Sequence, residues 1–106
     1  MKKARAYIIR PSGENVPMAP TRGKRFTLKE VQEVAGGAVD VIYDDGRRCM
    51  VAGKDSLEKL LYPNRIASDM ASKAMNIGYT IFGDVLVCKS GMLPREIVAV
   101  LQPREA

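Results

Sequence analysis

The sequence predicts a single α+β domain over residues 1–106, in which a mixed, mainly antiparallel sheet is packed by two to four short helices. Three observations predict this class. Runs of β-branched residues alternate with runs whose apolar residues recur at helical spacing. An Asp-Gly pair between two strand-like runs indicates an antiparallel hairpin. The 106 residues, 46% of them hydrophobic, can bury a core without disulfides. We expect residues 1–3 and 104–106 to be flexible ends.

The first quarter of the chain predicts two short strands and a loop. Residues 4–9 are strand-like, and this run ends at Arg10 because the following proline restricts the residue before it. Residues 16–19 predict an edge strand, since their proline has no amide hydrogen to donate to a neighbouring strand. Residues 20–25, PTRGKR, form a polar, basic loop that we expect to be mobile.

A helix is predicted next, with clear signals at both ends. Thr27 and Glu30 have the spacing of a capping box, in which each side chain accepts a hydrogen bond from the backbone amide of the other residue. Gly36 and Gly37 end the helix, because glycine enters the left-handed region without a Cβ clash.

A hairpin follows the glycine pair. Residues 39–43 are mostly β-branched or aromatic, which favours a strand, and residues 49–52 predict the returning strand. Between them, Asp44-Asp45-Gly46 is typical of a tight turn that needs positive φ angles.

Two helices are predicted after the hairpin. Residues 55–61 predict a short helix that ends at Pro63. Residues 66–77 predict a longer helix whose apolar stripe packs in the core. The stripe consists of Ile66, Met70, Ala74 and Ile77, and is widened by Ala67 and Ala71.

The last predicted strand is the most apolar one. Residues 79–88, YTIFGDVLVC, are apolar on both faces, so we expect this strand to be central in the sheet. Gly83-Asp84 interrupts the run, either as a β-bulge or as a kink that faces a ligand. Residues 94–102 fit a final helix opened by Pro94, but their β-branched residues leave an edge strand open.

The residue types present exclude the commonest catalytic arrangements. The chain has no histidine, so the usual general base and the usual partner of an activated serine or cysteine are missing. Its two cysteines, Cys49 and Cys88, lie in apolar strand-like runs, where we expect buried, reduced thiols; a disulfide between neighbouring strands is the alternative. No metal, nucleophile or phosphate-loop motif is present. We therefore expect no enzyme activity, no metal and no cofactor.

Two further properties bear on partners. No apolar run reaches the roughly 18 residues of a membrane span, so we expect no membrane partner and a cytoplasmic protein. The net charge is +5, and it is unevenly placed: residues 1–25 hold seven basic residues and one acidic residue, whereas residues 26–106 hold ten and eleven. This asymmetry allows a nucleic-acid or nucleotide partner, and nucleic acid would bind through Arg22, Lys24 and Arg25. The alternative is a solvated face with a flexible basic end.

A second candidate site uses residues at strand ends and in their adjoining loops. Its members are Arg10, Arg47, Arg48, Asn64 and Arg65. Guanidinium groups donate two parallel hydrogen bonds to a phosphate or carboxylate, and an amide can recognise a base or sugar. The predicted ligand is a small anion resembling a nucleotide; the alternative is that these are separate surface charges and a turn asparagine.

Five short segments along the chain form a further pattern, beyond the two candidate sites. They are Ile9-Arg10-Pro11, VQEVAGG (31–37), Asp45-Gly46, PNRIAS (63–68) and IFGDVLV (81–87). In these five segments and their order, the chain resembles a family of small uncharacterised domains carried by phages and conjugative elements. The resemblance covers about residues 4–90 and departs at PTRGKRF, residues 20–26, which is longer and more basic than usual. The family has no agreed activity, so the resemblance implies a setting in which small proteins inhibit or sequester host components.

Together these observations predict a non-enzymatic accessory binding protein of a phage or mobile element, with anti-defence as the implied role. It would act on a host protein or sequester a small anionic, nucleotide-like ligand. The alternative is non-specific binding of nucleic acid through the basic N-terminal quarter; the aromatic residues are not interleaved with basic ones in a base-stacking motif. A homo-oligomer is compatible with both readings.

Overall fold

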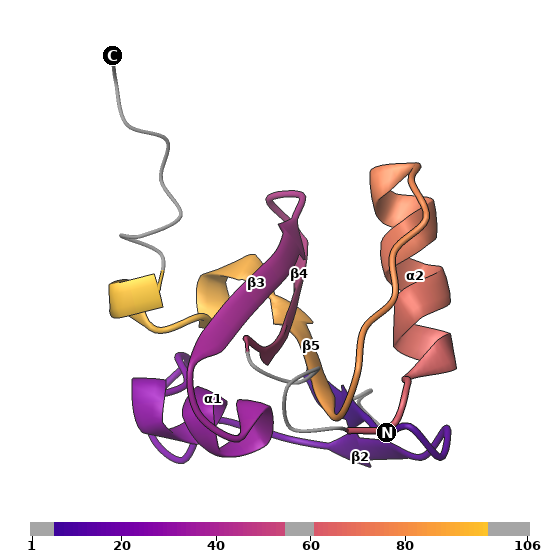
Figure 1. The fold of residues 1–106 in the computed structure, drawn as a ribbon. Helices are drawn as coiled ribbons and strands as arrows, with labels where there is room; N and C mark the ends of the chain where they lie inside the picture. The colour runs from indigo at the N-terminus through magenta and orange to yellow at the C-terminus, as the bar shows by residue number, and fades with distance from the viewer. Residues whose placement is uncertain (1–5, 55–60, 98–106) are drawn as a thin grey trace.

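A five-stranded antiparallel sheet forms the centre of the fold (Figure 1). The computed structural model describes residues 6–54 and 61–97. The strands, in the spatial order β2-β1-β5-β4-β3, are β1 (Tyr7–Ile9), β2 (Asn15–Pro17), β3 (Val39–Asp44), β4 (Arg48–Gly53) and β5 (Val85–Lys89). The helices are α1 (Leu28–Ala35), α2 (Arg65–Met75) and a 3₁₀ turn, η1 (Ser90–Met92). The predicted α+β class is confirmed.

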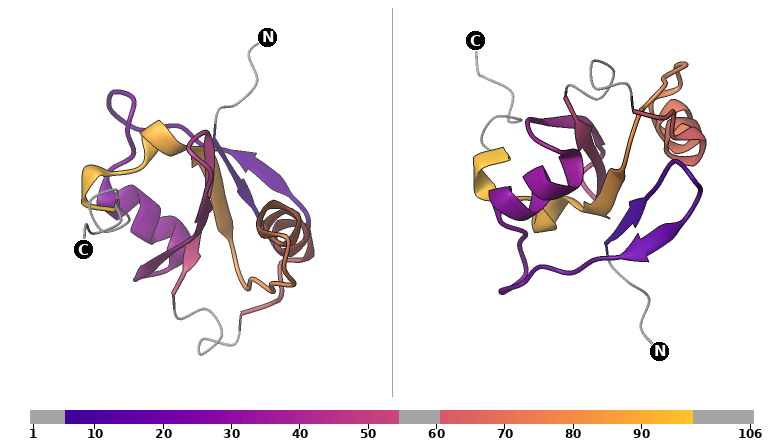
Figure 2. Two further views of the ribbon diagram at one scale, coloured as in Figure 1. Left: turned by 90° about the horizontal axis from the view of Figure 1, so that it is seen from above. Right: turned by 60° about the horizontal axis from the view of Figure 1, so that its bottom comes forward.

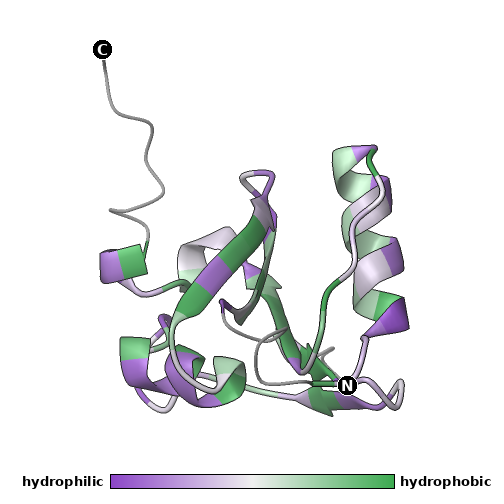
Figure 3. Cartoon of the chain, in the orientation of Figure 1, coloured by the Kyte–Doolittle hydropathy of each residue, from purple (hydrophilic) through white to green (hydrophobic). Residues whose placement is uncertain are grey.

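The two long helices cover opposite faces of the sheet (Figures 1 and 2). Successive side chains of a strand point to opposite faces, so each central strand feeds two cores. In β4, Cys49 and Val51 pack towards α1, whereas Met50 and Ala52 pack towards α2. The middle strand, β5, is buried on both faces and is hydrophobic until its last residue (Figure 3). The expectation that this strand is central is confirmed.

The capping box at the start of α1 is confirmed. The amide of Thr27 donates to Glu30 Oε1 at 2.8 Å, and the amide of Glu30 donates to Thr27 Oγ1 at 3.1 Å. Glu30 also accepts hydrogen bonds from the amide and the hydroxyl of Thr21, which ties the preceding loop to the helix. The hydroxyl of Thr21, followed by the amide of Thr27, lowers the pKa of Glu30. Gly36 ends the helix with a φ of 77°, as expected.

The predicted strand over residues 79–88 is too long. The strand β5 begins only at Val85, because Gly83 has a φ of 80° and leaves the pleated conformation. Before this kink the chain binds α2: Tyr79 donates its amide to Ser72 Oγ at 3.0 Å, and Ile81 donates its amide to Ser68 Oγ at 2.8 Å. These hydroxyls take the place of a neighbouring strand.

The apolar face predicted for the second long helix is buried at its small residues, Ala67 and Ala71, and not at Ile66 and Ile77. The sheet-facing side of α2 is built from Ala67, Ser68 and Ala71, whereas Ile66 is 45% exposed and Ile77 is 58% exposed. Small side chains let the helix come close to the sheet, and the hydrogen bond from the amide of Ile81 to Ser68 Oγ ties this face of the helix to residues 79–82.

Several expectations fall wholly or partly outside the described residues. The helix predicted over 55–61 lies almost wholly there, as do both expected flexible ends. Of residues 94–102, the structure describes 94–97: residues 95–97 are helical, and the amide of Ile97 donates to the carbonyl of Pro94 at 3.1 Å. The edge strand expected at 16–19 is found at Asn15–Pro17, at one edge of the sheet.

Candidate anion-binding site

The five residues predicted for a small-anion site divide between two ends of the sheet. Ile9, next to Arg10, lies opposite Val85 at the start of β5. Arg48 lies opposite Lys89, the last residue of that strand. At roughly 3.3 Å per residue, the two ends of β5 are about 13 Å apart. Arg10, Asn64 and Arg65 therefore share one end, and Arg47 and Arg48 share the other.

Asn64 is a structural residue and not a ligand-binding one. It is fully buried, and its Nδ2 donates to the carbonyls of Ile9 and Gly83, both at 2.8 Å. Its Oδ1 accepts from the amide of Ala67 at 3.1 Å, so Asn64 is also the N-cap of α2. Both amide hydrogens are thus used within the protein. The expectation that Asn64 contacts a ligand fails because this side chain joins β1, the kink before β5 and α2.

The remaining cations at this end are exposed. Arg10 lies in the β1–β2 turn, where its amide donates to the carbonyl of Glu14 at 2.9 Å. Arg65 is the first residue of α2. Arg10 follows Ile9 in the chain, and Arg65 follows Asn64. Because Asn64 donates a hydrogen bond to the carbonyl of Ile9, the backbones of the two arginines lie near one another. Neither arginine lines the cavities beside strand β3.

The opposite end contains a basic depression, which we call the hairpin-end site. Tyr43, Asp45, Arg47, Arg48 and Lys89 line this depression of about 400 Å³. Lys89 was not predicted from the sequence. In the sequence, Lys89 is recognisable only as a basic residue that follows an apolar strand-like run. Its position beside Arg48 depends on the pairing of β4 with β5.

The turn between β3 and β4 fixes the two arginines. Asp45 Oδ1 accepts from the amides of Arg47 and Arg48, at 2.9 and 2.8 Å. These amides, that of Arg48 first, lower the pKa of Asp45, so its carboxylate is ionised at neutral pH. Asp44 accepts from the hydroxyl of Ser90, whose amide donates to the carbonyl of Arg47 at 3.1 Å. The hairpin is therefore held against η1.

The charges of the hairpin-end site are mostly uncompensated. Arg47, Arg48 and Lys89 are exposed, and none of them forms an ion pair with another residue of 6–54 or 61–97. Tyr43 is half-buried; burial raises its pKa, an effect that Arg48 opposes, so the phenol stays a neutral donor. The site thus offers cationic donors beside an aromatic ring.

The residues predicted to bind nucleic acid lie at this same end. Arg25 donates from Nη1 to the carbonyl of Leu93 at 2.7 Å, directly after η1. At about 2 Å per residue, η1 spans only about 6 Å between this contact and the Ser90–Arg47 hydrogen bond. Figure 2 shows η1 between the loop before α1 and the hairpin turn. Arg22 and Lys24 are exposed in that loop. Arg25 is partly structural, because its guanidinium anchors the loop.

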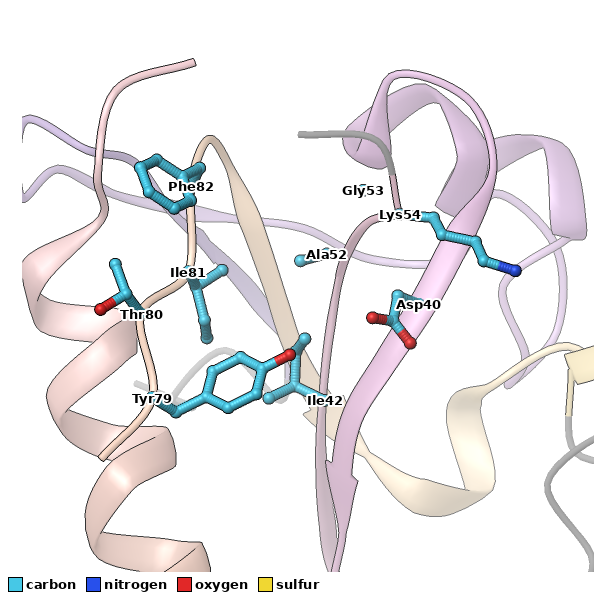
Figure 4. A pocket seen from close by; sticks show the side chains of 9 residues that line it. All are labelled: Asp40, Ile42, Ala52, Gly53, Lys54, Tyr79, Thr80, Ile81 and Phe82. Atoms are coloured by element: carbon cyan, nitrogen blue, oxygen red, sulfur yellow. The ribbon is translucent and has the colours of Figure 1, made fainter. Parts of the chain in front are cut away.

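A second cleft lies between the β3–β4 hairpin and residues 79–82 (Figure 4). It measures about 170 Å³ and carries Asp40 and Lys54 on the side of the hairpin. The ring of Tyr79 points towards Ile42, and the side chain of Lys54 extends away from the cleft. This volume is below the roughly 300–1,000 Å³ of typical small-molecule pockets, so the cleft does not fit a nucleotide.

The cysteines do not form a chemical centre. Cys49 and Cys88 are free, buried and directly opposite one another in β4 and β5, with their Sγ atoms 3.3 Å apart. The hydrogen bond with Cys88, together with burial, raises the pKa of Cys49, which keeps it a thiol. The expected buried thiols are confirmed. Within the described residues, no three histidine, cysteine or carboxylate side chains are grouped as a metal site requires.

Comparisons of the chain with protein-family models, with curated proteins and with solved structures found no match. Across residues 6–54 and 61–97, no helix is both long enough and apolar enough to cross a membrane. The function is therefore argued from the geometry of the hairpin-end site.

Proposed function

We propose that this chain is a non-enzymatic binding protein that recognises a small anionic, nucleotide-like ligand at the hairpin-end site. One observation carries the proposal: Arg47, Arg48 and Lys89 converge beside Tyr43 on one depression of about 400 Å³. Three cations and one carboxylate line the depression, so it keeps a net positive charge that a bound anion would neutralise. The volume lies within the range of ordinary ligand pockets.

Each residue has a distinct part in this proposal. Arg47 and Arg48 donate paired hydrogen bonds to phosphate oxygens, and Lys89 adds a point charge. Tyr43 offers a ring edge and a phenol to the base or sugar. Asp45 holds the turn and contributes no ligand contact, because its carboxylate already accepts two backbone amides.

Binding without catalysis is proposed because the commonest general base and the commonest activated thiol nucleophile are both missing from the site. Histidine is absent from the chain, and the cysteine nearest the site, Cys49, is a buried thiol of raised pKa. In the phage or mobile-element setting that the resemblance implies, such a protein would sequester a host nucleotide. A host protein with an acidic surface is the other partner that this setting allows.

The test is isothermal titration calorimetry against mono-, di- and cyclic nucleotides, with inorganic phosphate as the reference anion. Arg48→Lys keeps the charge but loses the bidentate fork, so affinity should fall about tenfold, equivalent to roughly 1.4 kcal/mol. Arg65→Lys is the matched control at the opposite end of the sheet and should leave affinity unchanged. Equal losses in both variants, or no heat with any nucleotide, would remove the small-ligand proposal.

Non-specific nucleic-acid binding is the second candidate, because the loop with Arg22 and Lys24 is joined to the hairpin-end site through η1. A single strand could then contact both groups of cations. In that case an oligonucleotide should bind much more tightly than a mononucleotide, and its affinity should fall steeply with salt. The double variant Arg22→Ala/Lys24→Ala should weaken only the oligonucleotide. Equal affinity for both ligands supports the small-ligand proposal instead.

A further inference from the structure

The two edges of the sheet differ in how they are protected against pairing with a further strand. The edge strand β2 has three residues and ends at Pro17, which has no amide hydrogen to donate. At the other edge, β3 has six residues, with no proline or lysine among them (Figure 1). Proteins usually shorten an edge strand or place lysine or proline in it. Strand β3 therefore has an edge that can accept a further strand.

The outward backbone groups of β3 belong to Val39 and Val41. The amide of Lys54 donates to the carbonyl of Ala38 at 2.9 Å, which fixes the alternation of hydrogen bonds between β3 and β4. Every second residue of an antiparallel pair bonds to the neighbouring strand, so Ala38 and Asp40 bond to β4. The N–H and C=O groups of Val39 and Val41 point away from β4, which is the one strand paired with β3 in the described residues. The register shifts only after Val41, so this stretch is regular.

A cavity of about 500 Å³ lies beside this stretch, on the face of the sheet that α1 covers. Its apolar lining residues are Leu28, Ala38, Val39, Val41 and Ile97. A strand paired with β3 places the side chains opposite Val39 and Val41 on this same face. Apolar side chains at these two positions would fill the cavity and remove its lining from water.

The charges along this edge are mostly acidic. Asp40, Lys54 and Glu96 line the cavity, and an adjoining depression of about 410 Å³, which shares Val41, adds Asp44. All four charged side chains are exposed. Three carboxylates and one ammonium give them a net charge of −2, although the whole chain carries +5. Charge complementarity therefore favours a basic partner, and it disfavours a second copy of β3, whose edge has the same negative sign.

We propose that β3 binds an extended segment of a partner protein in which an apolar, a basic and an apolar residue follow one another. The two apolar side chains lie opposite Val39 and Val41 and enter the cavity. The basic side chain lies between them on the other face of the sheet, opposite Asp40. Backbone pairing with Val39 and Val41 supplies affinity, and the alternation of side chains supplies specificity. The proposal does not depend on nucleotide binding at the hairpin-end site.

Fluorescence anisotropy on the full chain tests the proposal with a dye-labelled heptapeptide of alternating valine and lysine, blocked at both ends. We expect a dissociation constant on the order of 0.1 mM, because a short segment must be ordered when it binds. The matched peptide of alternating valine and glutamate should bind at least about tenfold more weakly, since its charges meet charges of the same sign.

Two substitutions separate backbone pairing from charge. Val41→Pro removes an outward amide hydrogen and no hydrogen bond to β4, so it should abolish peptide binding while the fold persists. Far-UV circular dichroism checks the fold. Asp40→Lys should reverse the preference between the two peptides, which is a gain that a folding defect does not produce. Glu14→Gln is the control, because this exposed residue adjoins the opposite edge strand β2 and should change neither affinity.

Four results would overturn the proposal. Wild type that binds neither peptide at about 1 mM excludes the site at the expected affinity. Equal affinity for both peptides, or a preference that Asp40→Lys leaves unchanged, excludes the basic partner. Binding that persists in Val41→Pro excludes pairing at this edge. A dimer that sedimentation velocity detects in the wild type and not in Val41→Pro makes a second copy the occupant instead.

Discussion

Asn64→Ala is expected to be among the most destabilising single changes in the chain. The side chain of Asn64 is fully buried, and it makes three hydrogen bonds that join three separate segments. Alanine keeps the backbone but removes both donors to the carbonyls of Ile9 and Gly83. It also removes the acceptor that caps α2 at the amide of Ala67.

The size of the effect follows from these contacts. Loss of an N-cap side chain typically costs about 1 kcal/mol. Each lost hydrogen bond to a buried carbonyl typically costs about 1 kcal/mol, and more when the carbonyl is left unpaired. We expect a loss of about 3 kcal/mol, with a range of about 2–5. For a domain of this size that corresponds to a fall in Tm of roughly 10–25 °C.

Urea unfolding followed by far-UV circular dichroism measures this loss, since the chain has no tryptophan to report by fluorescence. Asn15→Ala is the control: this asparagine is exposed on the edge strand β2 and should change stability by less than about 0.5 kcal/mol. A loss below about 1 kcal/mol for Asn64→Ala, at an unchanged denaturant slope, would refute the structural role.

Asn64→Asp adds a dependence on pH that a packing defect alone would not produce. The new carboxyl group keeps the capping oxygen but turns a second oxygen towards the carbonyls of Ile9 and Gly83. Burial and these carbonyls raise its folded pKa above the usual value of about 3.9. The folded state then favours the protonated form, so the charge-related penalty is absent below about pH 4. It grows as pH rises, up to the folded pKa. Equal stability losses at about pH 3.5 and about pH 7 would contradict this reasoning.

Three further predictions concern residues away from Asn64. Because hydrogen bonds lower the pKa of Glu30, its share of stability is present above its unfolded pKa of about 4.5 and is lost as pH falls; Glu30→Gln should flatten this acid limb in urea titrations. A thiol reagent should label Cys49 and Cys88 only as fast as the protein unfolds, and rapid native labelling would count against their burial. Gly83→Ala should cost about 1–2 kcal/mol because its φ is 80°, whereas Gly78→Ala, at an open position without positive φ, should be nearly neutral.

The parts of the fold that the sequence predicts well are those set by local chemistry. The capping box of Thr27 and Glu30 and the turn at Asp45 each depend on groups within three residues of one another. Such short spacings can be recognised directly in the sequence. The kink at Gly83 was expected at the right place, but it does not merely bulge a continuous strand. Residues 79–82 lie outside the five-stranded sheet, and their strand-like pairing is an isolated bridge between Phe82 and Pro63.

The buried face of α2 was predicted only in part, because periodicity identifies an apolar face but not which of its residues pack in the core. Ile66 and Ile77 have a stronger helical pattern than Ala67 and Ala71, yet the small residues face the sheet. The hydrogen bond from the amide of Ile81 to Ser68 Oγ ties this face of the helix to residues 79–82, and a separation of 13 residues cannot be read from helical spacing.

The grouping of the candidate site residues could likewise be predicted only in part, because it depends on which strands pair. Arg47 and Arg48 were found from their position after a turn, but Lys89 joins them only through the pairing of β4 with β5, 41 residues away from Arg48. Arg10 and Arg65 looked equivalent in sequence, and the antiparallel order of the strands places them at the other end of the sheet.

The segment PNRIAS, residues 63–68, is structural, and ligand recognition can vary independently of it. It contributes Asn64 and Ser68, whose side chains hold α2 to β1 and to the kink before β5. This segment thus supplies the fold, and it does not include Arg47, Arg48 or Lys89. A chain could keep every one of these structural hydrogen bonds and present a different hairpin end, because residues 44–48 of the hairpin are exposed. Ligand specificity in this architecture is therefore expected to follow Arg47, Arg48 and Lys89 and not the segment PNRIAS.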